Sequence, residues 1–521
     1  MIRSTGCVLA FGGLALVMIV PRCAGQIIPK QTTPLSRQAP PSGPGVCSPE
    51  KSCAEVAPVI IESARGVSPL EENLRYLTDT IGGRVTGSAA ADRAVSWAVE
   101  AFRQAGVDEV HTEKFTVPVG WSEGATRAEV LSPAEFRLRL VSTGWSPATP
   151  EGGITGAVVD VGDGDEAGFA RAGAAAKGAI VLVHSKLLVT WDDLDNEYDD
   201  QPAIIDRAVK AGAAAIFWMS TRTNLLLYRH TNSGDGKLEE LPQAVVARED
   251  ALRVARFLSN RQQVQVHLEM PNHISGPVES ENVIAEIRGR EKPDEFVLLG
   301  AHLDSWELGT GALDDGCNAA MVIDAARAIR ASGSTPRRSI RFALFTGEEQ
   351  GMLGSWAYAK AHRDELDQMV AAIIFDNGNG RVTGYSLGGR KDILPAVREA
   401  LEPIASLGVR DYTLDAGAGT DNFDFLLEGV PTLVANQEPA NYMPNYHAAS
   451  DTFDKVDIPE LKTHVAIAAV TAYALADREE RIGVRQSRPE IQELMKESGL
   501  EETMKKEGIW EMWTSGERGR Q

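Results

Sequence analysis

The strongest constraint on the fold is a series of short apolar segments that alternate with helical patterns from about Glu281 onward. Each segment is four to six residues long, the usual length of a buried strand. The predicted strands are 296–299, 340–345, 370–375 and 432–435. Between the first two, residues 318–330 place apolar side chains three and four positions apart, as one face of a helix does. This alternation predicts an α/β fold, with a mixed and mostly parallel sheet sandwiched by helices.

The rest of the chain divides into segments of different character. Residues 57–119 carry helical patterns and then a strand pattern, so we assign them to one domain together with residues 276–478. Residues 120–275 contain short β-rich pieces and are predicted to form an inserted domain. Residues 479–521 are rich in charged side chains, and we predict a helical tail there.

The N-terminus has the pattern of a secretory signal peptide. Arg3 precedes an apolar stretch at residues 7–20, which is too short to span a bilayer, and small residues follow it. We therefore predict that residues 1–25 are removed on export. A lipoprotein anchor at Cys23 and a buried N-terminal helix are the competing interpretations.

Residues 26–56 are rich in Pro, Ser and Gln and are predicted to form a flexible lead-in. A disulfide between Cys47 and Cys53 would suit an exported segment, and the sequence leaves it open. The mature protein is expected to be secreted or periplasmic, with no membrane insertion after signal cleavage.

Charge excludes some classes of function. Acidic residues outnumber basic ones by 73 to 52, which gives a formal net charge of −21. Such a surface repels phosphate backbones and anionic lipid headgroups, so we expect no nucleic-acid partner and no binding to membrane surfaces. Five cysteines in 521 residues exclude a disulfide-stabilised scaffold.

Polar residues follow three of the predicted strands at the point where each strand ends. They are His302, Asp304, Glu348, Glu349 and Asp376. Ligands of open α/β sheets collect at the carboxyl ends of strands, so we expect these side chains to share one site. Two further candidates are Asp314, in a glycine-rich turn before a helix, and His447, in a late loop.

Imidazole and carboxylate groups together are the ligand set of a hydrolytic zinc centre. Two histidines and three carboxylates suit two ions roughly 3.5 Å apart, with one carboxylate between them. Bound cations also explain how several acids can share one sheet edge without raising one another's pKa. The adjacent pair Glu348 and Glu349 can divide the work, one binding metal and the other acting as general base.

These motifs resemble a known family. They are His302-Leu303-Asp304-Ser305-Trp306, 311–316, 346–351, Phe375-Asp376 and 447–452. The resemblance is to the zinc exopeptidases that include bacterial leucyl aminopeptidases and plasma glutamate carboxypeptidase (carboxypeptidase Q), nearer the latter, over roughly residues 60–118 and 280–478. It implies a two-zinc enzyme that hydrolyses dipeptides or short peptides, and the predicted signal peptide would direct this enzyme to export. The resemblance does not determine which end of the peptide is recognised. It also leaves open whether the protein forms a homodimer.

The resemblance also implies a role for each residue. The implied metal ligands are His302, Asp314, Glu349, Asp376 and His447. Asp314 would bridge two zinc ions; His302 and Asp376 would complete one ion, and Glu349 and His447 the other. Glu348 would take a proton from the metal-bridging water and then protonate the leaving amine.

Further residues are implied to support the site. Asp304 would orient the imidazole of His302, and Tyr446 matches a position where some relatives use a phenol to stabilise the oxyanion. Asp421 is a candidate for a residue that contacts the metal ligands and orients them without binding metal itself. Cys317 is interpreted as a small buried residue rather than a ligand.

Three segments of the insertion, 177–183, 208–216 and 241–246, resemble the protease-associated domain that related peptidases carry. Such a domain would cap the cleft and restrict substrate length. The acidic stretch from Trp191 to Asp200 is interpreted as a solvated loop, although a site for calcium or a substrate amine would have the same composition.

Three other classes of protein share part of this pattern. Residues 384–388 match a serine-hydrolase nucleophile elbow, with Asp421 and His447 following in order, but the run before them is not an apolar strand. A one-zinc glutaminyl cyclase-like enzyme is the second class, and retention of His302 and Asp376 favours the two-metal hydrolase over it. A non-catalytic peptidase-like binding ectodomain is the third. Binding ectodomains of this kind lose ligands, and this chain has lost none.

Overall fold

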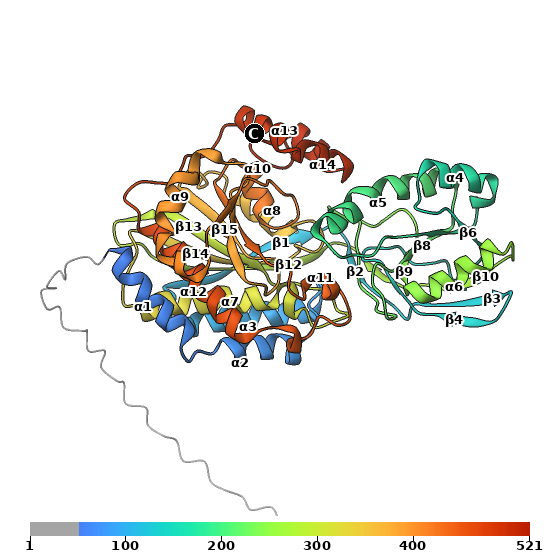
Figure 1. Ribbon diagram of the computed structural model, residues 1–521, viewed down its shortest axis with the longest axis horizontal. Helices are drawn as coiled ribbons and strands as arrows, with labels where there is room; N and C mark the ends of the chain where they lie inside the picture. The colour runs from blue at the N-terminus through green and yellow to red at the C-terminus, as the bar shows by residue number, and fades with distance from the viewer. Residues whose placement is uncertain (1–51) are drawn as a thin grey trace, which may run out of the picture. The chain divides into compact units, whose positions relative to one another are not determined.

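The computed structural model describes residues 52–521 (Figure 1). The predicted signal peptide, most of the lead-in, and Cys47 lie outside these residues. Helix α1, Cys53–Arg65, starts inside the predicted lead-in. The carboxylate of Glu55 accepts hydrogen bonds from the backbone N–H and the hydroxyl of Ser52, which stabilises the start of the helix. The end of the lead-in is therefore helical rather than flexible.

The main domain is built on an eight-stranded sheet, and the predicted α/β fold is confirmed. In spatial order its strands are β1 (Glu109–Val117), β12 (Val278–Ile287), β14 (Arg338–Phe345), β13 (Lys292–His302), β15 (Met369–Ile374), β18 (Thr432–Gln437), β16 (Val382–Ser386) and β17 (Asp411–Thr413). The four central strands, β14, β13, β15 and β18, are parallel. The pairs β1–β12, β12–β14 and β16–β18 are antiparallel.

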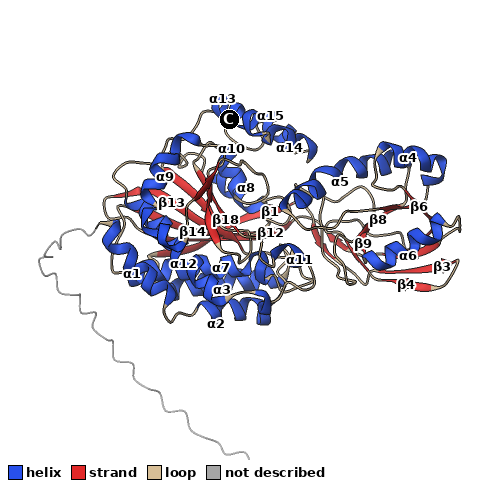
Figure 2. Cartoon of the chain, viewed as in Figure 1, coloured by secondary structure: helices blue, strands red, loops and turns tan. Residues whose placement is uncertain are grey.

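Helices cover both faces of this sheet (Figure 2). They are α2 (Leu70–Arg75), α3 (Ala89–Ala105), α7 (Cys317–Ala331), α8 (Leu353–Ala361), α9 (Leu394–Ala400), α10 (Asn422–Leu427), α11 (Tyr442–Asn445) and α12 (Ile458–Asp477), together with α1. Alternate residues of β13 enter different cores. Val297 and Leu299 pack in the core that includes α1, α3, α7 and α12, whereas Phe296 and Leu298 pack in the core that includes Tyr358 of α8. Burial on both faces makes β13 apolar from Phe296 up to its last residue, His302.

The insertion forms a second eight-stranded sheet. Its strands in order are β4 (Phe136–Leu138), β3 (Arg127–Ser132), β10 (Gln265–Glu269), β6 (Ile154–Asp160), β7 (Ile180–Val183), β8 (Ala215–Met219), β9 (Gln243–Val246) and β5 (Leu140–Ser142). Strands β6 to β9 are parallel, and α4 (Glu166–Ala172), α5 (Trp191–Ala211) and α6 (Arg248–Ser259) lie between strands in the sequence. A small sheet of β2 (Gly120–Ser122) and β11 (His273–Ser275) pairs the segments that enter and leave the insertion.

The acidic stretch 191–200 is the first half of α5, so its interpretation as a solvated loop was wrong. Thr190 and Asp193 form a capping box at the start of this helix, which overcomes the low helix propensity of the aspartates that follow. No helix in residues 52–521 is long and apolar enough to cross a membrane.

Three helices follow α12, namely α13 (Arg488–Ser498), α14 (Leu500–Lys506) and α15 (Trp510–Ser515). Beyond them, Arg518 is buried and donates two hydrogen bonds of 2.8 Å to the carboxylate of Asp424 on α10. It also donates to the backbone carbonyl of Gly351, at 3.1 Å. The C-terminal segment is thus joined to the main domain by a buried ion pair.

We expect Arg518→Met to lower the free energy of unfolding by about 3–5 kcal/mol, because it leaves the buried carboxylate of Asp424 without its cation. Arg381→Met is the control, since Arg381 and Glu438 are 52% and 50% exposed and such pairs contribute under about 1 kcal/mol. Denaturant titration of both variants measures the difference. If both variants lose the same small amount of unfolding free energy, the pair of Arg518 and Asp424 does not stabilise the attachment of the C-terminal segment.

Candidate metal centre

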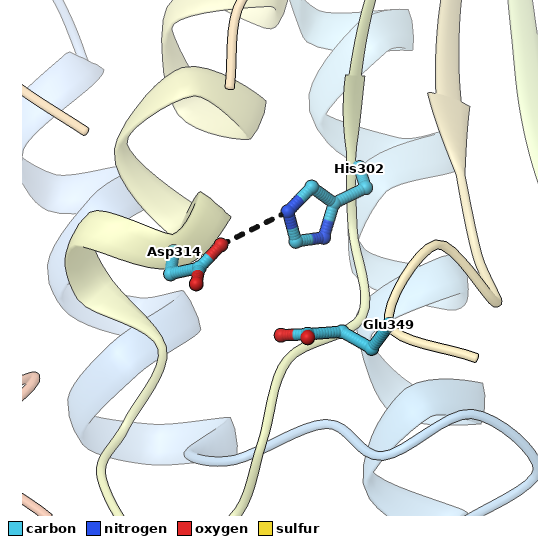
Figure 3. A group of neighbouring side chains, drawn as sticks. All are labelled: His302, Asp314 and Glu349. Carbon is cyan, nitrogen blue, oxygen red and sulfur yellow. Dashed lines mark hydrogen bonds and ion pairs between the residues drawn. The ribbon is translucent and has the colours of Figure 1, made fainter. Parts of the chain in front are cut away.

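Parallel strands deliver the candidate residues to one edge of the main sheet. His302 is the last residue of β13, Glu349 lies four residues after β14, and Asp376 lies two residues after β15. These strands are parallel neighbours, so their carboxyl ends meet at the same edge. Asp314 lies in the turn Ala312–Gly316 before α7, and His447 follows α11. In Figure 3 the side chains of His302, Asp314 and Glu349 point toward a common centre.

The carboxylate of Asp314 lies between two imidazoles. Its Oδ1 is 3.1 Å from Nε2 of His302, and its Oδ2 is 3.2 Å from Nε2 of His447. Each imidazole has a second carboxylate beside it: Oδ1 of Asp376 is 3.2 Å from the Nε2 of His302, and Oε2 of Glu349 is 2.9 Å from the Nε2 of His447. All five side chains are buried. They form two adjoining groups that share Asp314.

Backbone carbonyls orient both imidazoles. Nδ1 of His302 donates to the carbonyl oxygen of Asp304 at 3.1 Å, and Nδ1 of His447 donates to the carbonyl oxygen of Arg229, also at 3.1 Å. Each Nε2, which faces carboxylate oxygens, is then the ring nitrogen left to bind a metal. The carboxylate of Asp304 is 3.7 Å from Nδ1 of His302, beyond hydrogen-bond distance. The closer contact of Asp304 with His302 is therefore made by its backbone and not by the side chain expected from the resemblance.

The carboxylate of Asp304 instead holds the turn that carries Glu348. It accepts hydrogen bonds from the hydroxyl of Thr86 at 2.8 Å and from the backbone N–H of Glu348 at 3.3 Å. The same hydroxyl of Thr86 accepts from the N–H of Gly347 at 2.8 Å. Sequence reasoning missed Thr86; the only local signal was the glycine-rich segment 82–87, between two helical patterns.

Two more buried residues, to which the sequence analysis assigned no role, fix the turn of Asp314. The carboxylate of Asp451 accepts from the N–H groups of Leu313 at 2.7 Å and Asp314 at 3.2 Å. The guanidinium of Arg84 donates to the carbonyls that flank the ligands; these are Leu303 at 2.7 Å, Thr310 at 2.8 Å and Gly311 at 2.9 Å. Arg84 is too far from the ligands in sequence for spacing to reveal it, whereas Asp451 lies four residues after His447, within the motif 447–452, where it had no assigned role.

Asp315, adjacent to the predicted bridge, also belongs to the site. Its Oδ2 accepts from the backbone N–H of His302 at 3.3 Å, and its Oδ1 accepts from the amide of Asn318 at 2.6 Å. Its ligand atom lies within 4.8 Å of those of His302 and Asp376. The pair Asp314-Asp315 is visible in the sequence. Its pattern alone does not tell which carboxylate lies between the two imidazoles and which lies beside His302 and Asp376.

Buried acids and imidazoles shift one another's pKa. Burial raises the pKa of Glu349 to about 7, with His447 opposing and Asp314 adding to the shift. Burial disfavours the cation of His447, but Glu349 and Asp314 outweigh it and raise its pKa to about 10. Burial and then the charge of Asp376 raise the pKa of Glu348 well above its ordinary value. The cluster holds more negative charge than its own residues compensate.

The residues present fit a bound metal. Oε1 of Glu349 is buried and has no hydrogen-bond partner among the described residues. The ligand atoms of His302, Asp314 and Glu349 lie within 4.8 Å of one another. Imidazole nitrogens with carboxylate oxygens are the donors that zinc prefers at hydrolytic sites. A divalent cation would also supply the positive charge that the cluster lacks.

The remaining candidates lie around this cluster. The ring of Tyr446 stacks on His447 with centroids 3.7 Å apart, and its hydroxyl is 2.8 Å from that of Tyr198 in the insertion. Asp421 is fully buried, which raises its pKa to about 8. Cys317 is buried in the first turn of α7, where its Sγ donates to a backbone carbonyl.

A serine-hydrolase site finds no support in the geometry. Residues 382–386 form strand β16, which runs through the first three residues of the motif and does not end before it. Its Ser386 donates a hydrogen bond of 2.6 Å to the carbonyl oxygen of Asp415. His447, which would have to serve as its base, is engaged with Asp314 and Glu349.

We expect Asp314→Ala to lose most of the bound zinc, since the substitution removes the carboxylate that both groups share. Asp324→Asn on α7 is the matched control; Asp324 is also buried, but its carboxylate pairs with Arg327. Metal analysis after dialysis against a fixed low concentration of free zinc gives the result. A zinc content equal to that of the unchanged protein would contradict the assignment.

Zinc binding at pH 7 should release protons. His447 and Glu349 must be deprotonated to ligate, and their raised pKa values of about 10 and about 7 leave protons on them in the metal-free protein. Zinc affinity should therefore fall as the pH drops through 7. Calorimetric titration in buffers of different ionisation enthalpy counts the protons, and release of fewer than about one at pH 7 would contradict the expectation.

Comparison with known proteins agrees with this geometry. The profile of "Peptidase family M28" matches residues 282–472, which include all five candidate ligands. Carboxypeptidase Q of Mus musculus is 31% identical over 414 residues, covering 79% of this chain and 86% of the relative. Aminopeptidase YwaD of Bacillus subtilis is 24% identical over 432 residues, and the match covers 78% of this chain and 84% of the aminopeptidase.

Among solved structures, a peptidase M28 precursor from Shewanella amazonensis superimposes with a TM-score of 0.76 at 30% identity. The match covers 84% of this chain and 99% of that one. The chain therefore has the fold of the Shewanella amazonensis peptidase and is about 30% identical in sequence to it and to carboxypeptidase Q over most of its length. The chain belongs to peptidase family M28, the zinc metallo-exopeptidases whose motifs its sequence carries.

Proposed function

We propose that the chain is an exported exopeptidase that holds two zinc ions and hydrolyses dipeptides or short peptides. The observation that carries the proposal is the position of Asp314, whose two oxygens each face a different imidazole. Each imidazole has a further carboxylate beside it, so the cluster offers two sets of ligands that share one bridge. This arrangement suits a pair of ions and is more than a single ion requires.

In this proposal His302, Asp376 and Asp314 hold one zinc ion. Glu349 and His447 hold the other, again with Asp314. When bound, the zinc ions polarise the scissile carbonyl and lower the pKa of water. The chain's own part is to hold the ligands rigidly, which the backbone contacts at both Nδ1 atoms support.

Glu348 is proposed as the general base. It takes a proton from the attacking water and passes it to the leaving amine. Its backbone N–H is held by Asp304, and its half-buried side chain lies near other acids, so that burial and then the charge of Asp376 raise its pKa. A raised pKa suits a group that must both accept and donate a proton near neutral pH. Tyr446 is proposed to stabilise the oxyanion.

The wider setting completes the proposal. Residues 1–25 would direct export to the periplasm or the medium, and the insertion would act as a protease-associated domain. Its three resembling segments lie in or next to β7, β8 and β9, the parallel strands of the second sheet. A short peptide is the proposed partner. Assembly as a homodimer is compatible with this function.

Glu348→Gln should lower kcat by at least about 100-fold and leave zinc content unchanged, because the substitution removes a proton carrier but no ligand. The exposed Glu399→Gln is the control. The substrates are one short peptide series with either terminus blocked, and rates are measured on zinc-loaded protein. Retained activity in Glu348→Gln would refute the assigned role.

The same series assigns the specificity. A required free amine indicates an aminopeptidase, a required free carboxylate indicates a carboxypeptidase, and a requirement for both indicates a dipeptidase. If zinc-loaded protein cleaves no peptide, the peptidase proposal falls. A glutaminyl cyclase-like enzyme and a binding ectodomain then become the leading candidates, and cyclisation of an N-terminal glutaminyl peptide separates them.

A further inference from the structure

The loop that carries His447 is paired with a segment of the insertion. The backbone N–H of Arg229 donates to the carbonyl oxygen of His447 at 2.9 Å. The imidazole Nδ1 of His447 donates back to the carbonyl oxygen of Arg229 at 3.1 Å. One residue on, Tyr228 and Ala448 form an antiparallel bridge, and the N–H of Ala449 donates to the carbonyl of Leu227 at 3.0 Å. The pairing resembles a short strand ladder between the two domains.

Two side chains of the insertion reinforce this pairing at Tyr446. The hydroxyl of Tyr198, on α5, is 2.8 Å from the hydroxyl of Tyr446. The guanidinium of Arg222 donates to the backbone carbonyl of Tyr446 at 2.8 Å. Arg222 is buried and its guanidinium lies 4.4 Å from the centre of the Tyr228 ring, which restricts its rotation. The residue before the ligand is therefore held at both its backbone and its side chain.

The conformation of His447 explains why such support matters. Its φ angle is +54°, in the left-handed region that non-glycine residues rarely occupy. A residue in this region persists when its surroundings over-determine it. On the other side of the cluster, His302 ends a central strand of the main sheet and is oriented by Asp304 of its own domain. The two imidazoles thus differ in what holds them.

We propose that the insertion positions one of the ligands of the metal centre. Tyr198, Arg222 and the segment 227–229 are positioning residues for His447, so the ion held by Glu349 and His447 depends on the insertion. The ion held by His302 and Asp376 does not. This inference rests on the proposed function in one respect, namely that two ions bind to the cluster.

The test uses Arg222→Met and Tyr198→Phe in the full-length protein. Arg248→Met is the matched control, because Arg248 is also an arginine of the insertion that donates to backbone carbonyls, those of Ser185 and Ser220. These acceptors lie within the insertion and not on the His447 loop. Far-UV circular dichroism and the denaturant midpoint show that each variant folds.

Zinc affinity is measured by competition with a chelator that sets the free zinc concentration. Loss of the outer support of a metal ligand costs about 10–100-fold in affinity. We expect Arg222→Met and Tyr198→Phe to weaken one of the two binding steps by that factor and to leave the other unchanged. At an intermediate concentration of free zinc, the stoichiometry should fall from two ions toward one. Arg248→Met should keep both steps.

Cobalt(II) supplies a second reading that does not require activity. Its absorption spectrum reports the geometry of each ion, so the variants should alter the spectrum of one cobalt and preserve the other. Unchanged affinities and spectra in both variants would overturn the inference. Equal weakening of both steps, or the same loss in Arg248→Met, would also overturn it, because either result indicates general destabilisation.

Failure of the proposed function gives a different pattern. If the unchanged protein binds zinc but cleaves no peptide, the peptidase proposal fails, and a selective loss in the variants still supports the role of the insertion. If the unchanged protein binds a single ion, the two-ion proposal fails. The role of the insertion is then overturned if that ion binds equally well to Arg222→Met and Tyr198→Phe.

Discussion

The site depends on one constraint, which is that the carboxylate of Asp314 faces two imidazoles at once. Burying an acid among other acids is costly unless positive charge or hydrogen bonds compensate it. The surroundings of Asp314 meet this demand. Its N–H is held by Asp451, helix α7 begins directly after its turn, and each of its oxygens has a cationic or metal-binding neighbour.

The main sheet makes this arrangement possible. A strand that is buried on both faces can end in a polar residue only at the sheet edge, where no further packing is required. β13, β14 and β15 are parallel neighbours, so three chain segments that lie far apart in sequence reach the same edge. The rigidity of the packed sheet then fixes the distances between their terminal side chains to within the range that a metal ion needs.

Support for the site comes from regions where sequence patterns carry little information. Thr86 and Arg84 come from the segment before the insertion, and Arg229 comes from the insertion itself. Most of these contacts use backbone carbonyl or N–H groups. Nearly every residue type has both groups, so the type of residue at a position does not predict such a contact. Asp304 illustrates the difference, because its carbonyl makes the shorter contact with His302 while its carboxylate serves the turn of Glu348.

The sequence by itself determined the α/β fold of the main domain, the strands that end in polar residues, and the five side chains with the chemistry of a metal site. Local periodicity and strand ends are properties of adjacent residues, so one chain reveals them. The tertiary structure decided that Asp315 joins the cluster and that Arg229 orients His447 across 218 positions of chain. Contacts of this length exist only after the chain has closed on itself, and no spacing in the sequence specifies them.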